Sequence, residues 1–166
     1  MNNKIIAWYQ GKAEIGPRAL GHRSFIGLPT PASMKERLSE RVKGREPYRP
    51  VSPTVLQSDT PEYFEFDSSS DYMSFAPVAK KIAFDSAPAI VHADGTARLQ
   101  TITGATQPIL AAILDELKKR GSPPIIMNSS FNVRGQPIVD TPDDALSTFK
   151  NCEADVLYIN GKRFVK

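Results

Sequence analysis

Apolar residues recur at two spacings along the chain, and the change from one spacing to the other predicts mixed strands and helices. Lys4–Tyr9 has the character of a strand that begins almost at the first residue. Between Ser33 and Gly44 the apolar residues fall four apart, which predicts a helix that ends near Gly44. Ser33 followed by Glu36 has the form of a capping box at the start of this helix.

Prolines and turn residues divide the rest of the chain. Three prolines between Pro47 and Pro53 exclude a helix, so we expect Val51–Leu56 to be extended. Asp94 and Gly95 form a turn signal, which predicts two paired strands on either side. The remaining expected elements are a loop at Asp67–Asp71, the paired strands Ala89–His92 and Arg98–Ile102, an amphipathic helix from Ile109 to Leu117 stopped by Gly121, a buried strand at Pro124–Met127, a capped helix that starts at Thr141, and strands at Val156–Ile159 and Phe164–Val165. This alternation predicts one domain of the α/β (α+β) class, with helices packed on a sheet.

The composition indicates an ordinary globular protein. The chain has 166 residues, of which 40% are hydrophobic and 23% charged, enough to bury roughly 70% of the unfolded surface. A single cysteine, Cys152, excludes an intramolecular disulfide. No stretch approaches the ~20 apolar residues of a membrane helix, and Met1–Gln10 lacks a signal-peptide pattern. We therefore expect a cytoplasmic protein with no membrane partner.

The charges are unevenly distributed. The net charge of +3 is too small to indicate a nucleic-acid binder. Residues 11–50, however, hold nine basic and four acidic side chains, whereas residues 51–75 hold five acidic and no basic ones. Two interpretations remain open: the basic excess forms a pocket for a small anion, or the two segments pair with each other in the fold.

Two basic stretches are candidates for anion binding. Gly16–Ser24 combines two glycines with Arg18 and Arg23, which allow close backbone approach and bidentate contacts, although no P-loop pattern is present. In Lys43–Pro50, an extended backbone would place Lys43 and the arginine two residues later on one side, where they could clamp a phosphate. The structural alternatives are a tight turn with surface ion pairs and a basic helix C-terminus.

A third candidate stretch is polar and neutral. Met127–Asn132 follows the predicted buried strand, and ligands of α/β sheets tend to lie beyond the carboxyl ends of strands. Plain turn chemistry explains the same residue types. His22 and His92 have no second ligand at metal spacing, and Cys152 has no partner, so we expect neither a metal site nor a cysteine nucleophile.

Five ordered motifs resemble a known family. The resemblance runs from about residue 6 to residue 160, and it is to the C-terminal domain of the NodU/tobramycin-type O-carbamoyltransferases, which is described as YrdC-like. It implies that residues 1–166 form one such domain, a twisted mixed sheet with helices packed on it. The motifs that carry it are Gly16–Ser24, Val42–Arg49, Asp94–Gln100, Asn128–Pro137 and Thr141–Ala145.

The resemblance also implies an activity. Carbamoyl phosphate and ATP, accompanied by Mg²⁺, would react to carbamoyl-adenylate with release of phosphate and pyrophosphate. A separate N-terminal ASKHA-like domain, absent from this chain, would then transfer the carbamoyl group to a hydroxyl acceptor, in cis or in trans. The family's Lys-x-Arg and Ser-x-Asn pairs match Lys43 with Arg45 and Ser130 with Asn132, which would be the catalytic residues. The residues expected to bind the nucleotide or carbamoyl phosphate are Arg18, His22, Arg23, Arg49, Arg98, Asn128 and Ser129.

Two other classes of function remain to be weighed. One is a non-catalytic nucleotide-binding or regulatory module that needs a partner chain. The other is an RNA-binding module, against which the sequence argues, because its basic residues do not alternate with exposed aromatic residues in a stacking platform.

Overall fold

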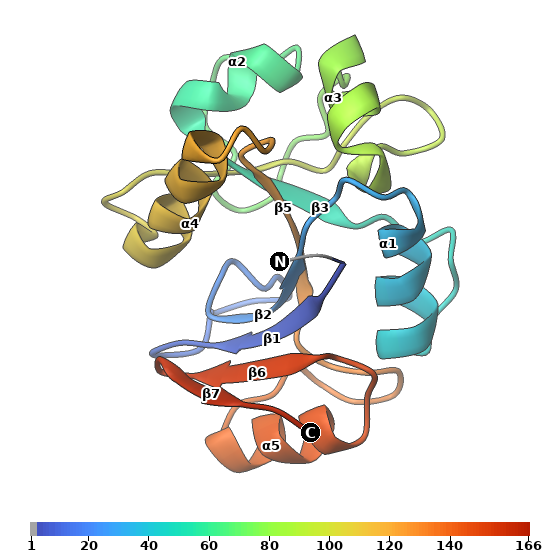
Figure 1. Cartoon of the computed structure of the whole chain (residues 1–166), viewed down its shortest axis with the longest axis vertical. Helices are drawn as coiled ribbons and strands as arrows, with labels where there is room; N and C mark the ends of the chain where they lie inside the picture. Colours follow the sequence, from blue (N-terminus) through green and yellow to red (C-terminus); the bar gives the residue numbers. More distant parts are fainter. Residues whose placement is uncertain (1–2) are drawn as a thin grey trace.

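A mixed sheet of seven strands forms the centre of the computed structural model, which describes residues 3–166 (Figure 1). The spatial order of the strands is β4-β3-β5-β2-β1-β6-β7. Two pairs, β1 with β6 and β3 with β4, are parallel, and the other neighbours are antiparallel. The strands are β1 (Ile5–Tyr9), β2 (Arg23–Gly27), β3 (Ser52–Leu56), β4 (Gln100–Ile102), β5 (Ile125–Ser130), β6 (Val156–Ile159) and β7 (Lys162–Phe164). The fold is therefore the mixed α/β class that the sequence predicts.

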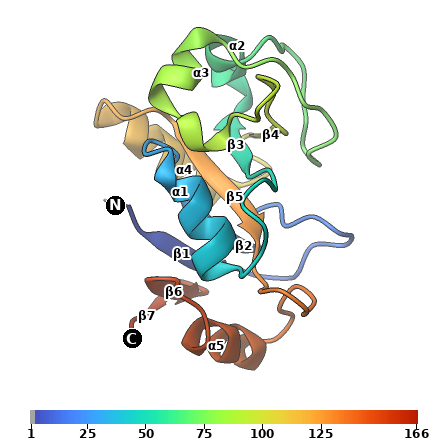
Figure 2. The same cartoon turned by 90° about the vertical axis from the view of Figure 1, so that its right-hand side faces the viewer.

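Helices lie on both faces of the sheet. The longest helix, α4, lies on one side, and α1 lies on the opposite side together with the π-helical turn η1 that continues it (Figures 1 and 2). No helix within residues 3–166 is both long and apolar enough to span a bilayer. The helical segments are α1 (Ser33–Glu36), η1 (Arg37–Val42), η2 (Gln57–Asp59), α2 (Thr60–Tyr63), α3 (Lys81–Ser86), η3 (Pro88–Ile90), α4 (Pro108–Lys119) and α5 (Pro142–Lys150).

The two hydrophobic layers follow from the alternation of side chains along each strand. In β5, Ile125 and Met127 pack in the larger core, beneath α1, α3 and α5. Ile126, between them, faces the smaller core with Trp8 and the apolar side of α4. A sheet that is buried on both faces needs strands with few exposed positions, and this explains the continuous apolar runs.

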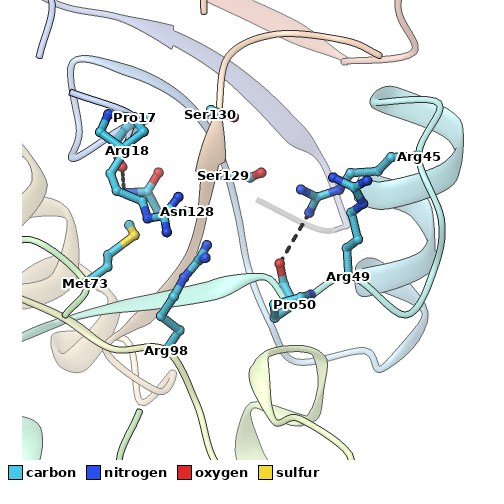
Figure 3. Close-up of a pocket in the computed structure, with 11 residues that line it drawn as sticks. Pro17, Arg18, Arg45, Arg49, Pro50, Met73, Arg98, Asn128, Ser129 and Ser130 are labelled. Carbon is cyan, nitrogen blue, oxygen red and sulfur yellow. Dashed lines mark hydrogen bonds between the residues drawn. The ribbon is translucent and has the colours of Figure 1, made fainter. Parts of the chain in front are cut away.

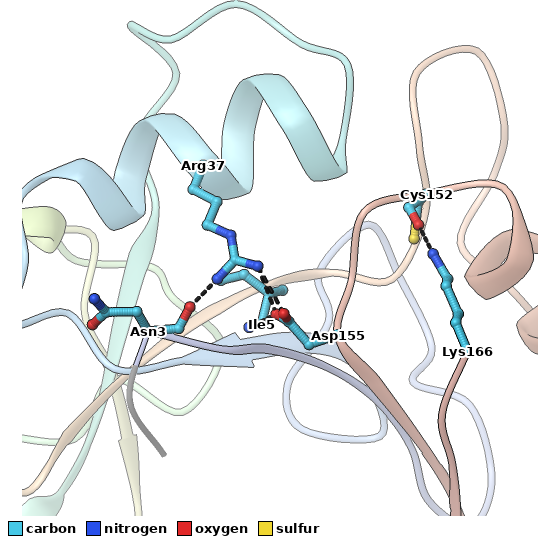
Figure 4. Close-up of polar contacts among 6 residues, drawn as sticks. All are labelled: Asn3, Ile5, Arg37, Cys152, Asp155 and Lys166. Carbon is cyan, nitrogen blue, oxygen red and sulfur yellow. Dashed lines mark hydrogen bonds and ion pairs between the residues drawn. The ribbon is translucent and has the colours of Figure 1, made fainter.

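A partly buried ion pair joins η1 to the starts of β1 and β6 (Figure 4). Arg37 donates to both carboxylate oxygens of Asp155 at 2.8 Å and also to the carbonyl of Asn3. Asp155 in turn accepts a bond of 2.7 Å from the backbone N–H of Ile5. One carboxylate thus holds the start of β1 beside β6 and the helix.

Two local predictions are wrong. Ser33 does not cap its helix: the N-cap is Ala32, which is already helical, so Ser33 lies within the first turn. The pairing of Ala89–His92 with Arg98–Ile102 is also absent, because Pro88 starts a short 3-10 turn and β4 pairs with β3 instead. The Asp94–Gly95 turn itself forms, and the Asp94 carboxylate accepts from Thr96 at 2.8 and 3.0 Å.

The strand β5 is longer than expected. Asn128, Ser129 and Ser130 belong to it and pair with β2, so they do not form a loop after it. The predictions of Lys4–Tyr9, Val51–Leu56, the helix stopped by Gly121 and the capped helix after Thr141 are confirmed to within two residues.

Candidate functional site

A cationic cavity of about 330 Å³ opens between the β1–β2 loop, β5 and the segment after η1 (Figure 3). Four arginine side chains converge on it from three separate parts of the chain. Among residues 3–166 no carboxylate lines this cavity, so the guanidinium groups repel one another unless an anion lies between them. The lining residues are Pro17, Arg18, Ala19, Arg45, Arg49, Pro50, Met73, Arg98, Asn128, Ser129 and Ser130.

A second cavity, of about 310 Å³, adjoins the first. The two share Arg45, Arg49 and Ser130 as a common wall. Its one carboxylate belongs to Glu46, which pairs with Arg49 at 2.8 Å and lies 4.0 Å from Arg134. The two cavities together offer space for two anionic groups side by side. The second is lined by Lys43, Arg45, Glu46, Arg49, Ser130, Asn132, Val133, Arg134 and Gly135.

Burial and mutual repulsion perturb the cations of these cavities. Burial, together with the charges of Arg49 and Arg98, lowers the pKa of Arg45 to about 10. Burial and the charge of Arg18 also lower the pKa of Arg98. The Nε atom of Arg45 is buried and has no hydrogen-bond partner in the described part of the chain. A bound anion would favour the charged form of these arginines and could accept a hydrogen bond from the Nε atom of Arg45. This combination is typical of an anion-binding site.

Lys43 lies at the floor of the second cavity inside a cage of oxygen atoms. Its Nζ donates to the carbonyl and Oγ of Ser130 and to the carbonyl and Oδ1 of Asn132, the last two at 2.8 and 2.9 Å. Ser130 Oγ also donates to Asn132 Oδ1 at 2.6 Å. Lys43 is only 4% exposed, and burial, aided by the charge of Arg45, holds its pKa well below the ordinary value. The Lys-x-Arg and Ser-x-Asn pairs are therefore in contact, although 87 residues separate Lys43 from Ser130.

The backbone that brings Lys43 and Arg45 together is not extended, and that premise of the sequence analysis is wrong. Lys43 is still helical, at the C-cap of η1, and Gly44 has a φ of +62°. Gly44 reverses the chain at this point, a conformation that costs a side-chain-bearing residue energy. The backbone N–H of Arg134 donates to the carbonyl of Lys43 at 2.9 Å and holds the turn against the segment after β5.

The β1–β2 loop that carries Arg18 is ordered by a carboxylate. Glu14 Oε1 accepts from the backbone N–H groups of Leu20 at 2.6 Å and His22 at 2.8 Å. Gly21 has a φ of +116°, and a Cβ atom there would lie 2.6 Å from the side chain of Leu110. The loop therefore packs closely on α4 and presents Arg18 and Ala19 to the first cavity.

Comparison with known proteins places the whole chain in a family. A family model described as "Carbamoyltransferase C-terminus" matches residues 1–166. The chain belongs to that family. It is 41% identical over 161 residues to nodulation protein NolO of Bradyrhizobium diazoefficiens, covering 95% of this chain and 29% of the relative. Nodulation protein NolNO of Sinorhizobium fredii is 40% identical over 158 residues, 93% of this chain and 23% of its own length. Nodulation protein U of Rhizobium tropici is 38% identical over 168 residues, 99% of this chain and 28% of its own length.

The structure brings most of the residues predicted for this carbamoyltransferase family domain to the two cavities. All four members of the Lys-x-Arg and Ser-x-Asn pairs line one or both. Of the seven expected binding residues, five line the first cavity: Arg18, Arg49, Arg98, Asn128 and Ser129. The chain spans less than a third of the length of each of these relatives.

Two of the predicted binding residues, His22 and Arg23, line neither cavity. Arg23 is 2% exposed, lies 3.4 Å above the ring of Tyr9 and donates to backbone carbonyls, including that of Gly11 at 3.0 Å. The ring of His22 contacts the carbonyl of Gln10 at 3.0 Å and the amide of Gln107 at 3.1 Å. These contacts tie the two ends of the β1–β2 loop to each other and to the start of α4.

Several lining residues lie outside the sequence predictions, among them Met73 and Arg134. Met73 belongs to the acidic segment, has a φ of +58° and reaches the first cavity. Arg134 lines the second cavity, from a stretch quoted for the family resemblance but without a role of its own. Strained backbone conformations, such as the positive φ of Met73, concentrate near functional sites. No sequence signal marks this residue.

The charge segments do not pair with each other. Among residues 3–166 no ion pair joins residues 11–50 to residues 51–75; Asp59, for example, accepts from Lys118 at 2.7 Å. The same part of the chain contains no cluster of three His, Cys, Asp or Glu side chains that could hold a metal ion. Four of the nine basic side chains of residues 11–50 line the two cavities: Arg18, Lys43, Arg45 and Arg49.

Proposed function

We propose that this domain binds ATP and carbamoyl phosphate and forms carbamoyl-adenylate for transfer to a hydroxyl acceptor. The observation that carries the proposal is the pair of adjoining cavities, with four arginines in one and the caged Lys43 in the other. Membership of the carbamoyltransferase family makes a carbamoyl donor the natural substrate class.

The proposed reaction has two steps, hydrolysis of carbamoyl phosphate and adenylation of carbamate. Water cleaves carbamoyl phosphate into carbamate and inorganic phosphate. A carbamate oxygen then attacks the α-phosphorus of ATP, and pyrophosphate leaves with the electron pair of the broken P–O bond. Negative charge grows on the departing pyrophosphate, and fixed cations aimed at it stabilise the transition state. Arg45 and Arg49 lie in the wall between the two cavities, where such charge would be shared.

The residues of the site divide this work. Arg18 and Arg98 would hold phosphate oxygens in the first cavity, and Lys43 would fix Ser130 and Asn132 in the second. Magnesium would neutralise phosphate charge when it accompanies ATP; phosphates and water would supply most of its ligands. Loss of one such cation typically costs ~3–4 kcal/mol of transition-state stabilisation.

Exchange of labelled pyrophosphate into ATP tests the proposal. Exchange should require carbamoyl phosphate and should fall at least ~100-fold in Arg45→Ala, because one fixed cation is lost. Arg163→Ala, an exposed arginine of β7, is the matched control and should exchange normally. A chain that binds ATP but never exchanges pyrophosphate would instead be a non-catalytic nucleotide-binding module that needs a partner chain.

A further inference from the structure

A chain of buried polar side chains runs beneath the first cavity. Thr54 on β3, Gln100 on β4 and Asn128 on β5 are each at most 1% exposed. Gln100 Oε1 accepts from Thr54 Oγ1 and from Asn128 Nδ2, both at 2.7 Å. Three neighbouring strands thus meet in one hydrogen-bonded group, with Asn128 at the end that lines the cavity.

Two backbone carbonyls determine which way the amides of this group point. Gln100 Nε2 donates to the carbonyl of Leu20 at 2.9 Å, and Asn128 Nδ2 donates to the carbonyl of Ala19 at 3.2 Å. A carbonyl only accepts, so each amide must turn its nitrogen toward it. The reversed Asn128 amide would bring its oxygen against two other acceptors, Gln100 Oε1 and the Ala19 carbonyl. Both hydrogens of Asn128 Nδ2 are therefore donated to acceptors within the protein.

The oxygen of the same amide lacks a partner within residues 3–166. Asn128 Oδ1 is shielded from solvent and accepts no hydrogen bond from any residue that the structure describes. Unpartnered buried acceptors are rare, and each calls for an explanation such as a ligand. Arg18 and Met73 flank Asn128 in Figure 3. Both side chains are long and have many rotamers, so their ends can move while the sheet stays in place. A ligand could then reach Asn128 Oδ1.

The rest of the cavity offers mainly hydrogen-bond donors. Arg18, Arg45, Arg49 and Arg98 supply guanidinium groups, which cannot accept. One oriented acceptor among so many donors selects a ligand that carries an N–H or O–H group next to its anionic part. In carbamoyl phosphate the only donor of this kind is the carbamoyl NH₂ group, because its other polar atoms are acceptors.

We propose that Asn128 Oδ1 accepts a hydrogen bond from the carbamoyl NH₂ group and thereby selects carbamoyl phosphate over acetyl phosphate. Acetyl phosphate has the same shape but a methyl group in that place, so it would leave the oxygen buried and unpartnered. Gln100 is a positioning residue: it touches no ligand and acts by holding the Asn128 amide in the accepting orientation. This inference rests on the proposed function, because it assumes that an acyl phosphate occupies the first cavity.

Calorimetric titration of the 166-residue chain with carbamoyl phosphate, acetyl phosphate and inorganic phosphate tests the assignment. We expect carbamoyl phosphate to bind about 10- to 100-fold more tightly than acetyl phosphate. This comparison needs no variant, so it decides the matter even if a substitution fails to fold. Equal affinities for the two acyl phosphates would overturn the inference and leave the acyl-phosphate site intact. Binding of none of the three ligands would overturn the proposed function itself.

Two substitutions locate the selectivity. Asn128→Leu should reduce the preference to within about threefold, through weaker binding of carbamoyl phosphate, while inorganic phosphate binds as before. Asn151→Leu, an exposed asparagine at the end of α5, is the matched control. An equal loss for all three ligands would make Asn128 structural, and a loss confined to ATP would assign it to the nucleotide; either result overturns the inference.

Gln100→Leu tests the positioning role with the same ratio. Thermal melting reports any loss of packing, whereas the ratio of the two acyl phosphate affinities reports the orientation of Asn128. We expect this ratio to fall by about 3- to 30-fold, because the Asn128 amide then loses its bond to Gln100 Oε1 and only the Ala19 carbonyl still holds its orientation. Full selectivity in a folded Gln100→Leu chain would remove Gln100 from the assignment.

Discussion

At the scale of single residues, the most informative side chain is Lys43. Its three hydrogens face four oxygen atoms of Ser130 and Asn132, so protein groups occupy every donor. What Lys43 adds beyond these bonds is its charge, in a place with few water molecules to screen it. It therefore serves as the support of the Ser-x-Asn segment as well as a cation of the cavity.

Replacement of Lys43 by methionine should expose both roles. Lys43→Met leaves the buried oxygens without donors, so we expect the free energy of unfolding to fall by about 1–3 kcal/mol. ATP affinity should fall as well. Urea denaturation and calorimetry measure the two effects. Lys119→Met, on the exposed side of α4, is the control. Unchanged stability together with weaker ATP binding would mean that Lys43 contacts the ligand directly and supports nothing.

The depressed pKa of Lys43 predicts a dependence on pH. Burial lowers the pKa in the folded chain below the unfolded value of 10.5, so between these two pKa values the unfolded chain holds more protons. Stability therefore rises with pH across that window. A bound anion favours the charged lysine and raises its pKa. Phosphate binding should thus take up protons and weaken as pH rises through the window. Calorimetry in buffers of different ionisation enthalpy measures the uptake; binding without uptake would contradict this.

At the scale of elements, the β1–β2 loop shows how one carboxylate organises a binding segment. Glu14 Oε1 accepts from three successive parts of the loop, the N–H groups of Leu20, His22 and Arg23, at 2.6, 2.8 and 3.3 Å. The carbonyl of Leu20 in turn holds Gln100. The loop is thus part of the site's framework and a carrier of Arg18.

Removal of the Glu14 carboxylate should loosen this loop. In Glu14→Ala the three N–H groups lose their acceptor, so we expect a loss of about 1–3 kcal/mol in stability. Hydrogen exchange should quicken at the Leu20 and His22 amides and stay unchanged in α5. Glu153→Ala, an exposed acid far along the chain, is the matched control. Unchanged exchange at Leu20 would show that packing on α4 alone holds the loop.

At the scale of the whole molecule, exposed cations such as Arg18 and Arg49 line the site, and the chain spans between 23% and 29% of the length of the relatives described above. Water can screen these exposed cations, and in the proposed reaction it could also reach a labile carbamoyl intermediate. The remainder of a full-length relative is the natural candidate to cover the site. In the proposed reaction, adenylation would need only the cavities of this domain, whereas transfer would need an acceptor site.

Complementation in trans tests this division. The 166-residue chain should exchange pyrophosphate slowly and should carbamoylate no hydroxyl acceptor by itself. Addition of the remaining N-terminal portion of a relative such as NolO should raise turnover about 10-fold or more, since water exclusion strengthens each charge interaction. Radiolabelled carbamoyl phosphate measures both activities. Acceptor carbamoylation by the isolated chain would show that this domain also builds the transfer site.

Much of the local structure follows from residues that lie close together in the sequence. Period-two and period-four patterns, the capping box at Thr141 and the glycine after α4 each depend on residues a few positions apart. The ordered motifs likewise single out Lys43, Arg45, Ser130 and Asn132, and all of them line the cavities.

Other features depend on contacts between distant segments. The strand expected at Ala89–His92 is absent, since Pro88 starts a 3-10 turn there and β4 pairs in parallel with the distant β3. Gly44, with a φ of +62°, turns a segment in which we expected Lys43 and Arg45 to be extended. Sequence alone also could not separate Arg18, which reaches the cavity, from Arg23, which stacks on Tyr9 five residues further along the same motif. Local sequence determines which elements form and which residue types are available. Burial and hydrogen bonds across the sheet decide which of those residues meet, because such contacts join positions nearly ninety residues apart.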